Sequence, residues 1–408
     1  MPRRVTLVLD MANSNNLLVM RLIIILVALV HSLSAKTLNV VSDYGAKADG
    51  VSDNSAAFLK AWKDACSTAG ETTIYVPSGQ YLVHPTLFSG PCVSTKITVQ
   101  VDGKLIPRTD SEGYGSSRYW LQFEKVKGMT FNGGNLDGKG SALWSCKAGK
   151  GKCPDGTRTM VFHKVSDVLV TGITSINSQL FHIVIDGCQN VRVDRIEIVA
   201  PDESPNTDGI HVEESTGVTI TNSNIGTGDD CISIGKGTQN LWIEGIKCGP
   251  GHGISIGSLG KEATEPGVQN VTVKNVVLTG TQNGLRIKSW ARKSTGFVKS
   301  IMFDGATMNN VKYPIIIDQD YCPDRKNCPG QTSGVKISQV TYSNVRGTSA
   351  TQVAVLFKCS PSSWCQGIRM ANVQLSYRGQ PSTSSCQNAI GTAGGLMVPQ
   401  SCLKLSST

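Results

Sequence analysis

The stretch Asn190–Ile198, NVRVDRIEI, is one copy of a pattern that returns along the chain. Within each copy apolar and polar residues alternate, and Gly, Asn and Ser separate the copies, which predicts two or three short strands per repeat. The copies lie 23–34 residues apart when they are aligned on their first apolar residues, which are Val168, Val191, Val218, Leu241, Val271, Ile301 and Val335.

A repeat of this length without a helix predicts an all-β solenoid, in which a coil of parallel strands stacks on its neighbours. Apolar residues should then point into the shaft and alternate polar residues outward, with Asn side chains stacking at the turns. A β-sandwich or a propeller is the alternative, although propeller blades need longer units of four strands. One helix is expected to cap the shaft, with Asp53 or Asn54 as N-cap and one apolar face formed by Ala57, Phe58, Ala61, Trp62 and Ala65.

The segment 1–35 has the features of a secretory signal peptide. Its apolar part ends in small residues near Ser34 and Ala35, and Met11 is a possible alternative start. A membrane anchor is the alternative, but Arg21 limits the uninterrupted apolar run to Leu22–Val30, which is short of the about 20 residues needed to span a bilayer. Residues 36–408 are expected to form a single domain, secreted and without stable membrane association.

The composition agrees with a secreted protein that is rich in turns. Charged residues make up 17% of the chain, and the formal net charge of +9 falls to +7 without residues 1–35. A modest positive charge suits an acidic polymer or an ordinary soluble surface, and no basic run interleaved with aromatic residues suggests nucleic acid. Asn270, in the sequence NVT, is the candidate glycosylation site.

All 13 cysteines lie after residue 35, which in an oxidising compartment predicts disulfides rather than a zinc site. Sequence alone does not fix the connectivity. Proximity along the chain favours Cys146–Cys153, Cys231–Cys248, Cys322–Cys328, Cys359–Cys365 and Cys386–Cys402, and Cys66–Cys92 would complete six pairs and leave Cys188 free.

A set of ionisable residues recurs at the repeat spacing. Asp208 and Asp229 lie 21 residues apart, and Asp229 and His252 lie 23 apart. Residues one repeat apart in a solenoid lie about one strand spacing apart, roughly 4.7–4.9 Å. Three coils would therefore place carboxylates, an imidazole and the cations Arg286 and Lys288 on one outward surface. The glycines beside them (Gly209, Gly228, Gly251, Gly253 and Gly284) would leave room for a polymer to approach.

These residue types suit hydrolysis of an acidic sugar chain. A glycosidic bond needs a proton donor at its leaving oxygen and an attacking group opposite, and crowding among Asp208, Asp229 and Asp230 would raise the pKa of at least one carboxyl. Arg286 and Lys288 would bind the substrate carboxylate. Taken singly, each residue has a plainer interpretation: an Asx turn at Asp208, a calcium ligand in Asp229–Asp230, or a solvated strand face at Arg286.

The motifs SPNTDG, GDDC, GHG and RIK, in this order and spacing, resemble the polygalacturonases of glycoside hydrolase family 28, and VSDYGAKADGVSDNSAAF near the start resembles plant members. The resemblance covers nearly the whole chain after residue 35. It implies a right-handed parallel β-helix and no cofactor or metal. The activity that the resemblance implies is hydrolysis, with inversion, of the α-1,4-galacturonosyl linkages of pectin in the cell wall.

The resemblance also implies residue roles. Asp229 matches the general acid, Asp208 and Asp230 the pair that activates water, and His252 the residue that supports the acid. Arg286 and Lys288 match binders of the galacturonate carboxylate, while Asn206 and, more loosely, Tyr321 match cleft residues.

Several alternatives stay open at this point. A pectate lyase-type enzyme or a silent pectin-binding protein could use the same scaffold, and the sequence favours endo-action over exo-action only slightly. A monomer acting on the acidic polysaccharide is expected.

Overall fold

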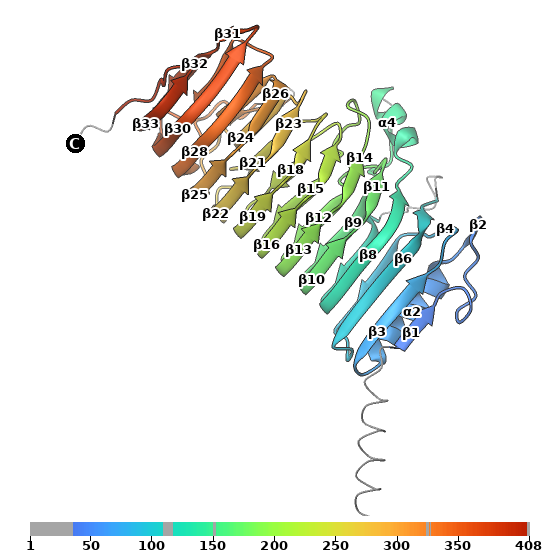
Figure 1. Cartoon of the computed structure of the whole chain (residues 1–408). Coiled ribbons are helices and arrows are strands. Elements are labelled where there is room, and N and C mark those ends of the chain that lie inside the picture. The colour runs from blue at the N-terminus through green and yellow to red at the C-terminus, as the bar shows by residue number, and fades with distance from the viewer. Residues whose placement is uncertain (1–35, 109–116, 150–151, 324–325, 327, 406–408) are drawn as a thin grey trace, which may run out of the picture.

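A computed structural model describes residues 36–108, 117–149, 152–323, 326 and 328–405. The predicted signal peptide at 1–35 lies outside these residues. Within the described ranges, no helix has both the length and the apolar character required to cross a bilayer. The described chain is an elongated stack of strands (Figure 1), which agrees with the predicted solenoid.

Three ladders of strands run along the shaft, and the pairings in them are parallel except between β30 and β31. The first ladder contains β1 (Lys36–Asn39), β3 (Glu71–Val76), β6 (Lys96–Ile106), β8 (Lys127–Asp137), β10 (Ser166–Thr171), β13 (Gln189–Asp194), β16 (Thr216–Thr221), β19 (Gln239–Glu244), β22 (Val268–Lys274), β25 (Phe297–Asp304), β28 (Lys336–Ser349), β30 (Cys365–Tyr377) and β33 (Ala389–Val398). The second contains β2 (Asp49–Asp53), β4 (Gln80–Leu82), β11 (Thr174–Ile176), β14 (Glu197–Val199), β17 (Asn224–Gly226), β20 (Lys247–Cys248), β23 (Val277–Thr279) and β26 (Thr307–Val311), and it joins the first through β6, β8 and β28. The short β31 (Gln380–Pro381) pairs with β30.

The third ladder is a separate sheet of 11 strands, which carries the functional site. It contains β5 (Thr86–Ser89), β7 (Tyr119–Glu124), β9 (Arg158–His163), β12 (Ile183–Asp186), β15 (Ile210–Glu213), β18 (Ile232–Ile234), β21 (Ile254–Leu259), β24 (Asn283–Trp290), β27 (Tyr313–Tyr321), β29 (Val353–Lys358) and β32 (Thr383–Gln387).

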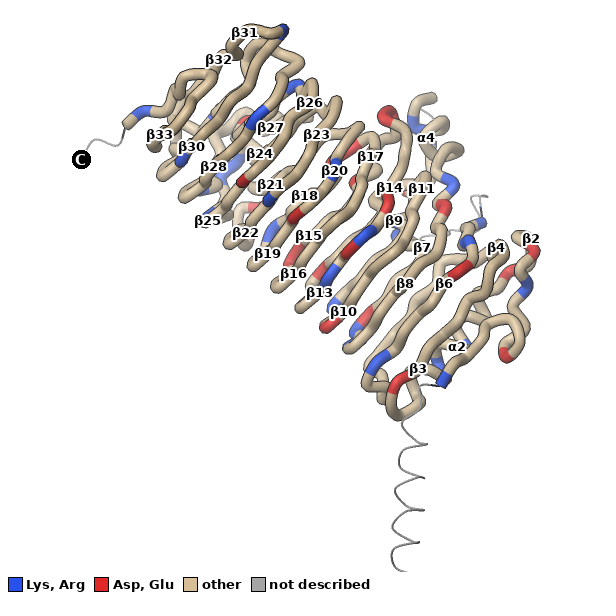
Figure 2. Tube along the Cα trace, in the orientation of Figure 1, with Lys and Arg blue, Asp and Glu red and all other residues tan. Residues whose placement is uncertain are grey.

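Apolar side chains stack in rows inside the shaft. One row of the 11-stranded sheet is fully buried and runs through Ile210, Ile232, Ile254, Leu285, Ile315 and Val355. Because successive side chains on a strand point to opposite faces, the next residue of each strand faces outward. Charged residues of both signs are scattered along the chain (Figure 2).

From β8 to β30, each strand of the first ladder has a left-handed residue near its start. Asn190, Asn240 and Asn270 all have a φ of 54°, a region that asparagine tolerates better than most residues. The apolar residues that follow them pair as predicted, for example Val168 with Val191 and Leu241 with Val271. The last predicted pairing is wrong, because Ile301 pairs with Val340 and not with Val335.

The error has a local cause. In that coil the left-handed position is occupied by Gln339, with a φ of 54°, so the turn residue (Asn, Asp, Gly or Ser) that marks this position in the other coils is missing from the sequence. The asparagine stacking is confirmed: the Asn270 side chain donates to Asn240 Oδ1 at 2.6 Å, and Asn190 donates to Asp167 Oδ1 at 3.1 Å. Asn270, the candidate glycosylation site, is exposed.

The predicted capping helix is confirmed as α2 (Ser55–Ser67), with Asn54 as N-cap and the predicted five side chains buried. Trp62 packs against Phe88 and Phe123 at the end of the shaft. A second helix, α4 (Ser141–Ala148), was not predicted. Leu143 is its only buried residue. A helix with so small a buried face has no apolar periodicity by which it could be predicted from the sequence.

All six predicted disulfides are present: Cys66–Cys92, Cys146–Cys153, Cys231–Cys248, Cys322–Cys328, Cys359–Cys365 and Cys386–Cys402. Cys188 is free and buried, as predicted. Burial raises the pKa of its thiol to about 11, which makes it an unreactive packing residue.

Candidate active site

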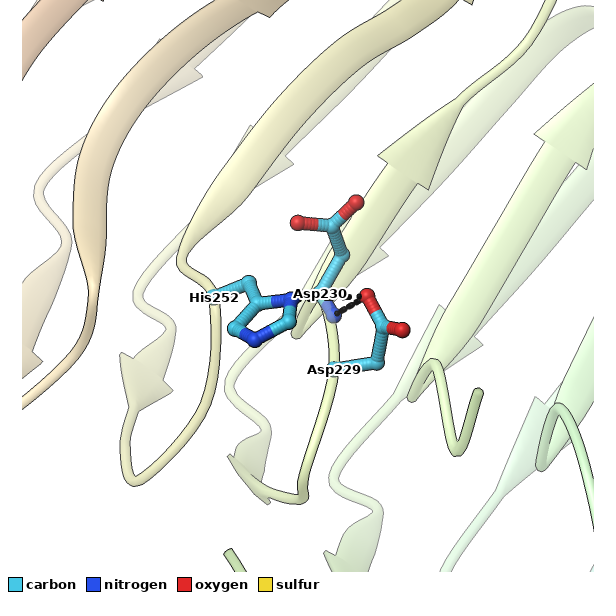
Figure 3. Close-up of side chains that lie close together, drawn as sticks. All are labelled: Asp229, Asp230 and His252. Atoms are coloured by element: carbon cyan, nitrogen blue, oxygen red, sulfur yellow. Dashed lines mark hydrogen bonds and ion pairs between the residues drawn. The ribbon is translucent and has the colours of Figure 1, made fainter. Parts of the chain in front are cut away.

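The turns that precede three neighbouring strands bring the predicted carboxylates together. Asp208, Asp230 and His252 each stand two residues before Ile210, Ile232 and Ile254, which pair in register. The sequence analysis had aligned Asp208 with Asp229, whereas the register aligns it with Asp230. Asp229 lies one residue earlier in the same turn and meets His252 from the side (Figure 3).

Asp230 forms the buried centre of the site. Its side chain is 1% exposed and accepts hydrogen bonds from Arg286 Nη2 at 2.6 Å, Lys288 Nζ at 2.7 Å and the Ser255 hydroxyl at 2.7 Å. Burial alone would raise the pKa of Asp230, but the charges of Arg286 and Lys288 outweigh it and hold the pKa below its ordinary value. Asp230 is therefore ionised.

Asp208 has the opposite electrostatic environment. It is buried, and none of the ion pairs among the described residues involves it. Burial, followed by the charges of Asp229 and Asp230, raises its pKa well above the ordinary value. The pKa of one carboxyl is thus raised as expected, but burial of Asp208 contributes more to the rise than crowding by Asp229 and Asp230 does.

Asp229 is the more accessible carboxylate. Its Oδ1 accepts the backbone N–H of Asp230 at 2.8 Å and lies 3.0 Å from His252 Nδ1 (Figure 3). The Asp229 side chain is 18% exposed, and that of His252 is 35% exposed. A carboxyl that is held by an imidazole and reaches solvent can exchange a proton with a bound molecule.

The carboxylates lie in an open cleft of 420 Å³. The predicted residues Asn206 and Tyr321 line it together with Asp208, Asp229, Asp230 and Lys288. Lys288 Nζ lies 5.2 Å from the centroid of the Tyr321 ring, and Tyr321 packs edge-on against Trp290 at 5.5 Å. The cleft therefore has a cationic and aromatic wall on the β24–β27 side.

Two expectations need correction. The plainer interpretation of Arg286 as a solvated strand face is wrong: Arg286 and Lys288 are each 7% exposed and both pair with Asp230, while Lys288 still lines the cleft. The neighbouring glycines serve backbone packing, because a Cβ at Gly228 would lie 2.1 Å from Ser204 O and one at Gly253 would lie 2.1 Å from Asn283 O. They let adjacent coils approach each other, and they do not open a path for a polymer.

The calcium interpretation of Asp229–Asp230 does not fit the charges. Possible ligand atoms of Asp229, Asp230 and His252 lie within 4.8 Å of one another. However, Arg286 and Lys288 already neutralise Asp230, and two cations so close would repel a divalent metal ion.

Several cleft residues were not predicted from the sequence, among them Phe181, His211, Glu213 and Ser233. His211 Nδ1 lies 2.8 Å from Ser233 Oγ on the next strand. The sequence does contain a signal for His211 and Ser233. Because side chains alternate along a strand, His211 must face outward if Ile210 faces inward, and Ser233 is its partner in register on the next strand.

Fold and site together define a class of protein, a parallel β-helix with clustered carboxyl groups in a cleft on its outer wall. Such carboxyl groups are what hydrolysis of a glycosidic bond requires. Comparison with known proteins narrows the class. The family model of "Glycosyl hydrolases family 28" matches residues 66–402. The chain belongs to this family and is a glycoside hydrolase.

Curated relatives cover nearly the whole chain. A "Polygalacturonase" from Prunus persica is 53% identical over 96% of this chain and 100% of its own length. An "Exopolygalacturonase" from Platanus acerifolia is 42% identical over 88% of this chain and 96% of its own length. Among solved structures, an endo-xylogalacturonan hydrolase from Aspergillus tubingensis has a TM-score of 0.75 at 21% identity, covering 91% of this chain and 99% of that one, and thus shares the fold.

Proposed function

We propose that this chain is a polygalacturonase that hydrolyses α-1,4-galacturonosyl linkages within pectin chains. One observation carries the proposal: Asp208, Asp229 and Asp230 converge in a cleft that Lys288 also lines, and Arg286 pairs with Asp230 beside it. Carboxyl groups are needed for glycoside hydrolysis, and cations select an anionic sugar. The relatives named polygalacturonase support this choice of substrate.

Asp229 is proposed as the general acid. It is the most accessible of the three carboxyls, and His252 Nδ1 lies 3.0 Å from its Oδ1. A protonated Asp229 would donate to the leaving glycosidic oxygen, and His252 would keep the carboxyl oriented.

Asp208 and Asp230 are proposed to activate the water, which gives inversion at the anomeric carbon. Asp230 is kept ionised by its two cations. Asp208 favours the protonated state. It must therefore lose its proton before it can act as a base, so the proton of the cluster has to pass from Asp208 to Asp229 or to solvent.

The carboxylate of the galacturonate is assigned to the wall formed by Lys288 and Tyr321, with Asn206 as a further contact. Arg286 is assigned to Asp230, because its Nε and Nη2 are engaged by Ser255 and Asp230. Arg286 thereby sets the position of Asp230 and Lys288 beneath the sugar.

We also propose that the protein is secreted into the cell wall and acts as a monomer. The apolar segment before residue 36 supports an export signal, and six disulfides are typical of an oxidising compartment. Asn270 is exposed and available for a glycan, since its Nδ2 uses only one of its two hydrogens toward Asn240.

The test is to incubate the purified protein with polygalacturonate and to measure new reducing ends. Asp229→Asn should lower turnover by about 10²–10⁴-fold, the usual contribution of a general acid, with an unchanged melting temperature. Asp102→Asn, at an exposed site on β6, is the matched control.

Near wild-type turnover in Asp229→Asn would exclude Asp229 as the acid. Products that absorb as unsaturated uronides, together with loss of activity in a chelator, would replace hydrolysis by lyase chemistry. Polymer binding without any release of reducing ends would indicate a silent binding protein.

A further inference from the structure

A second hollow continues the cleft toward the N-terminal end of the shaft. It measures 480 Å³ and is formed by side chains of β7, β9, β12 and β15, among them Arg158 and His163 of β9, and by Arg118, which directly precedes β7. It shares Phe181, His211 and Glu213 with the catalytic cleft. The two hollows therefore form one groove along the outer face of the 11-stranded sheet.

Arg158 and Phe181 extend the row of catalytic residues. The β9–β12 register aligns Arg158 with Phe181, and the β12–β15 register aligns Phe181 with Asp208. The backbone bonds that accompany these alignments are Thr159 N–H to Phe181 O at 3.0 Å and His182 N–H to Asp208 O at 2.8 Å. Arg158 is thus two strand spacings, about 10 Å, from Asp208 along the groove.

Phe181 holds the Arg158 side chain in place. The guanidinium carbon lies 5.4 Å from the centroid of the Phe181 ring, whose other neighbour is the His211 ring at 5.2 Å. Arg158 is half-buried, and a cation over an aromatic face is stabilised without losing its hydrogen-bond donors in the guanidinium plane.

The two arginines of the groove lie near acidic residues without a direct ion pair to them among the described residues. No ion pair between described residues involves Arg118 or Arg158, although the acidic residues Asp186 and Glu213 lie in the same hollow. Asp186 is bonded by His163 Nδ1 at 2.8 Å, and Glu213 Oε1 lies 3.8 Å from His211 Nε2. The carboxylates of the groove therefore have histidine partners, and none of the described carboxylates forms an ion pair with either guanidinium group, although Glu213 and Asp186 lie near enough to act on the charge of Arg158.

We propose that Arg158, assisted by Arg118, binds the carboxylate of a uronate residue of the substrate about two sugars away from the bond that is cleaved, and that Phe181 is its positioning residue. This inference rests on the proposed function. An arginine fork matches a carboxylate, and a regularly spaced anionic polymer places another carboxylate beyond the reacting sugar. The groove would then favour long chains over short oligomers.

Two measurements test the subsite. In active protein, Arg158→Ala should lower the ratio of kcat/KM for polygalacturonate to kcat/KM for the shortest hydrolysed oligogalacturonide by about tenfold or more, the loss expected for one charge-assisted contact. Arg158→Lys should fall between, because it keeps the charge and loses the fork. Arg192→Ala, an exposed arginine on β13 of the other sheet, is the matched control and should leave the ratio unchanged.

The second measurement does not depend on turnover. In an Asp229→Asn background, Arg158→Ala should weaken binding of intact polygalacturonate about tenfold, with a melting temperature equal to that of the parent variant. Unchanged binding and an unchanged ratio would overturn the subsite while the hydrolase assignment stands. Absence of reducing ends from the wild type would overturn the proposed function, and the binding result would still decide the role of Arg158.

Discussion

At the scale of single residues, Asp208 and Asp230 show how neighbouring carboxyls acquire opposite properties. The two cations beneath Asp230 lower its pKa, while burial and negative neighbours raise that of Asp208. A raised pKa in the folded chain means that the native state binds a proton more tightly than the unfolded chain does. The stability linked to Asp208 is then fully present below the pKa of an unfolded aspartate, and it is lost as the pH rises through the folded pKa.

This linkage predicts that Asp208→Asn stabilises the protein at neutral pH. Asparagine mimics the protonated carboxyl without its ionisation, and each unit of pKa difference between the states is worth about 1.4 kcal/mol. We expect the free energy of unfolding at pH 7 to rise, and the gain to shrink as the pH approaches 4. Thermal melts of both proteins across this range would show it, and a less stable variant at pH 7 would contradict it.

A second residue-scale prediction concerns Lys288. Lys288→Met removes one of the two cations that pair with the buried Asp230. Loss of a partner from a buried pair costs about 3–5 kcal/mol when the remaining charge is left alone, and Arg286 should reduce that cost. We expect a lower melting temperature and a higher KM for polygalacturonate.

Lys358→Met is the matched control for this change, because Lys358 pairs with Asp320 at an exposed site, where an ion pair contributes about 0–1 kcal/mol. Equal melting temperatures for the two variants would contradict the structural role of Lys288. An unchanged KM would remove its contact with the substrate.

At the scale of elements, the disulfide Cys231–Cys248 ties the residue after Asp230 to β20 of the next coil. We predict that the double variant Cys231→Ser and Cys248→Ser loses about 2–4 kcal/mol of stability, the usual effect of a disulfide, and loses activity through displacement of Asp230. Cys188→Ser, at the free buried cysteine, is the control for introducing a hydroxyl. A melting temperature equal to the wild type would contradict the prediction.

The elements also show which parts of the fold could be predicted from the sequence. The coil registers up to Ile301 could be predicted because Asn, Gly or another turn residue marks each left-handed position, and the marker fails at Gln339. The helix α4 has no amphipathic pattern to detect. The pairing of Asp230 with Lys288 could not be predicted, since the partners are 58 residues apart and their strands β18 and β24 are not adjacent.

At the scale of the whole molecule, the site lies midway along an open shaft. The strands β15, β18 and β21 behind Asp208, Asp230 and His252 have further strands of the same sheet on both sides (Figure 1). On the N-terminal side the cleft continues into the groove that contains Arg158. A polymer that crosses the site in its middle can be cut at internal bonds, whereas release of single end sugars needs a wall across the groove.

This geometry predicts endo-action, which relatives alone do not decide because one at 42% identity is named an exopolygalacturonase. Sizing the products of polygalacturonate at early times should give a ladder of oligomers, and the viscosity of the solution should fall well before most bonds are cleaved. The Arg158→Ala variant should change the distribution of product lengths, because sugars beyond the reacting pair would no longer be held in one register. Monomer as the sole early product would show that the groove is closed at one end, and the endo prediction would then be wrong.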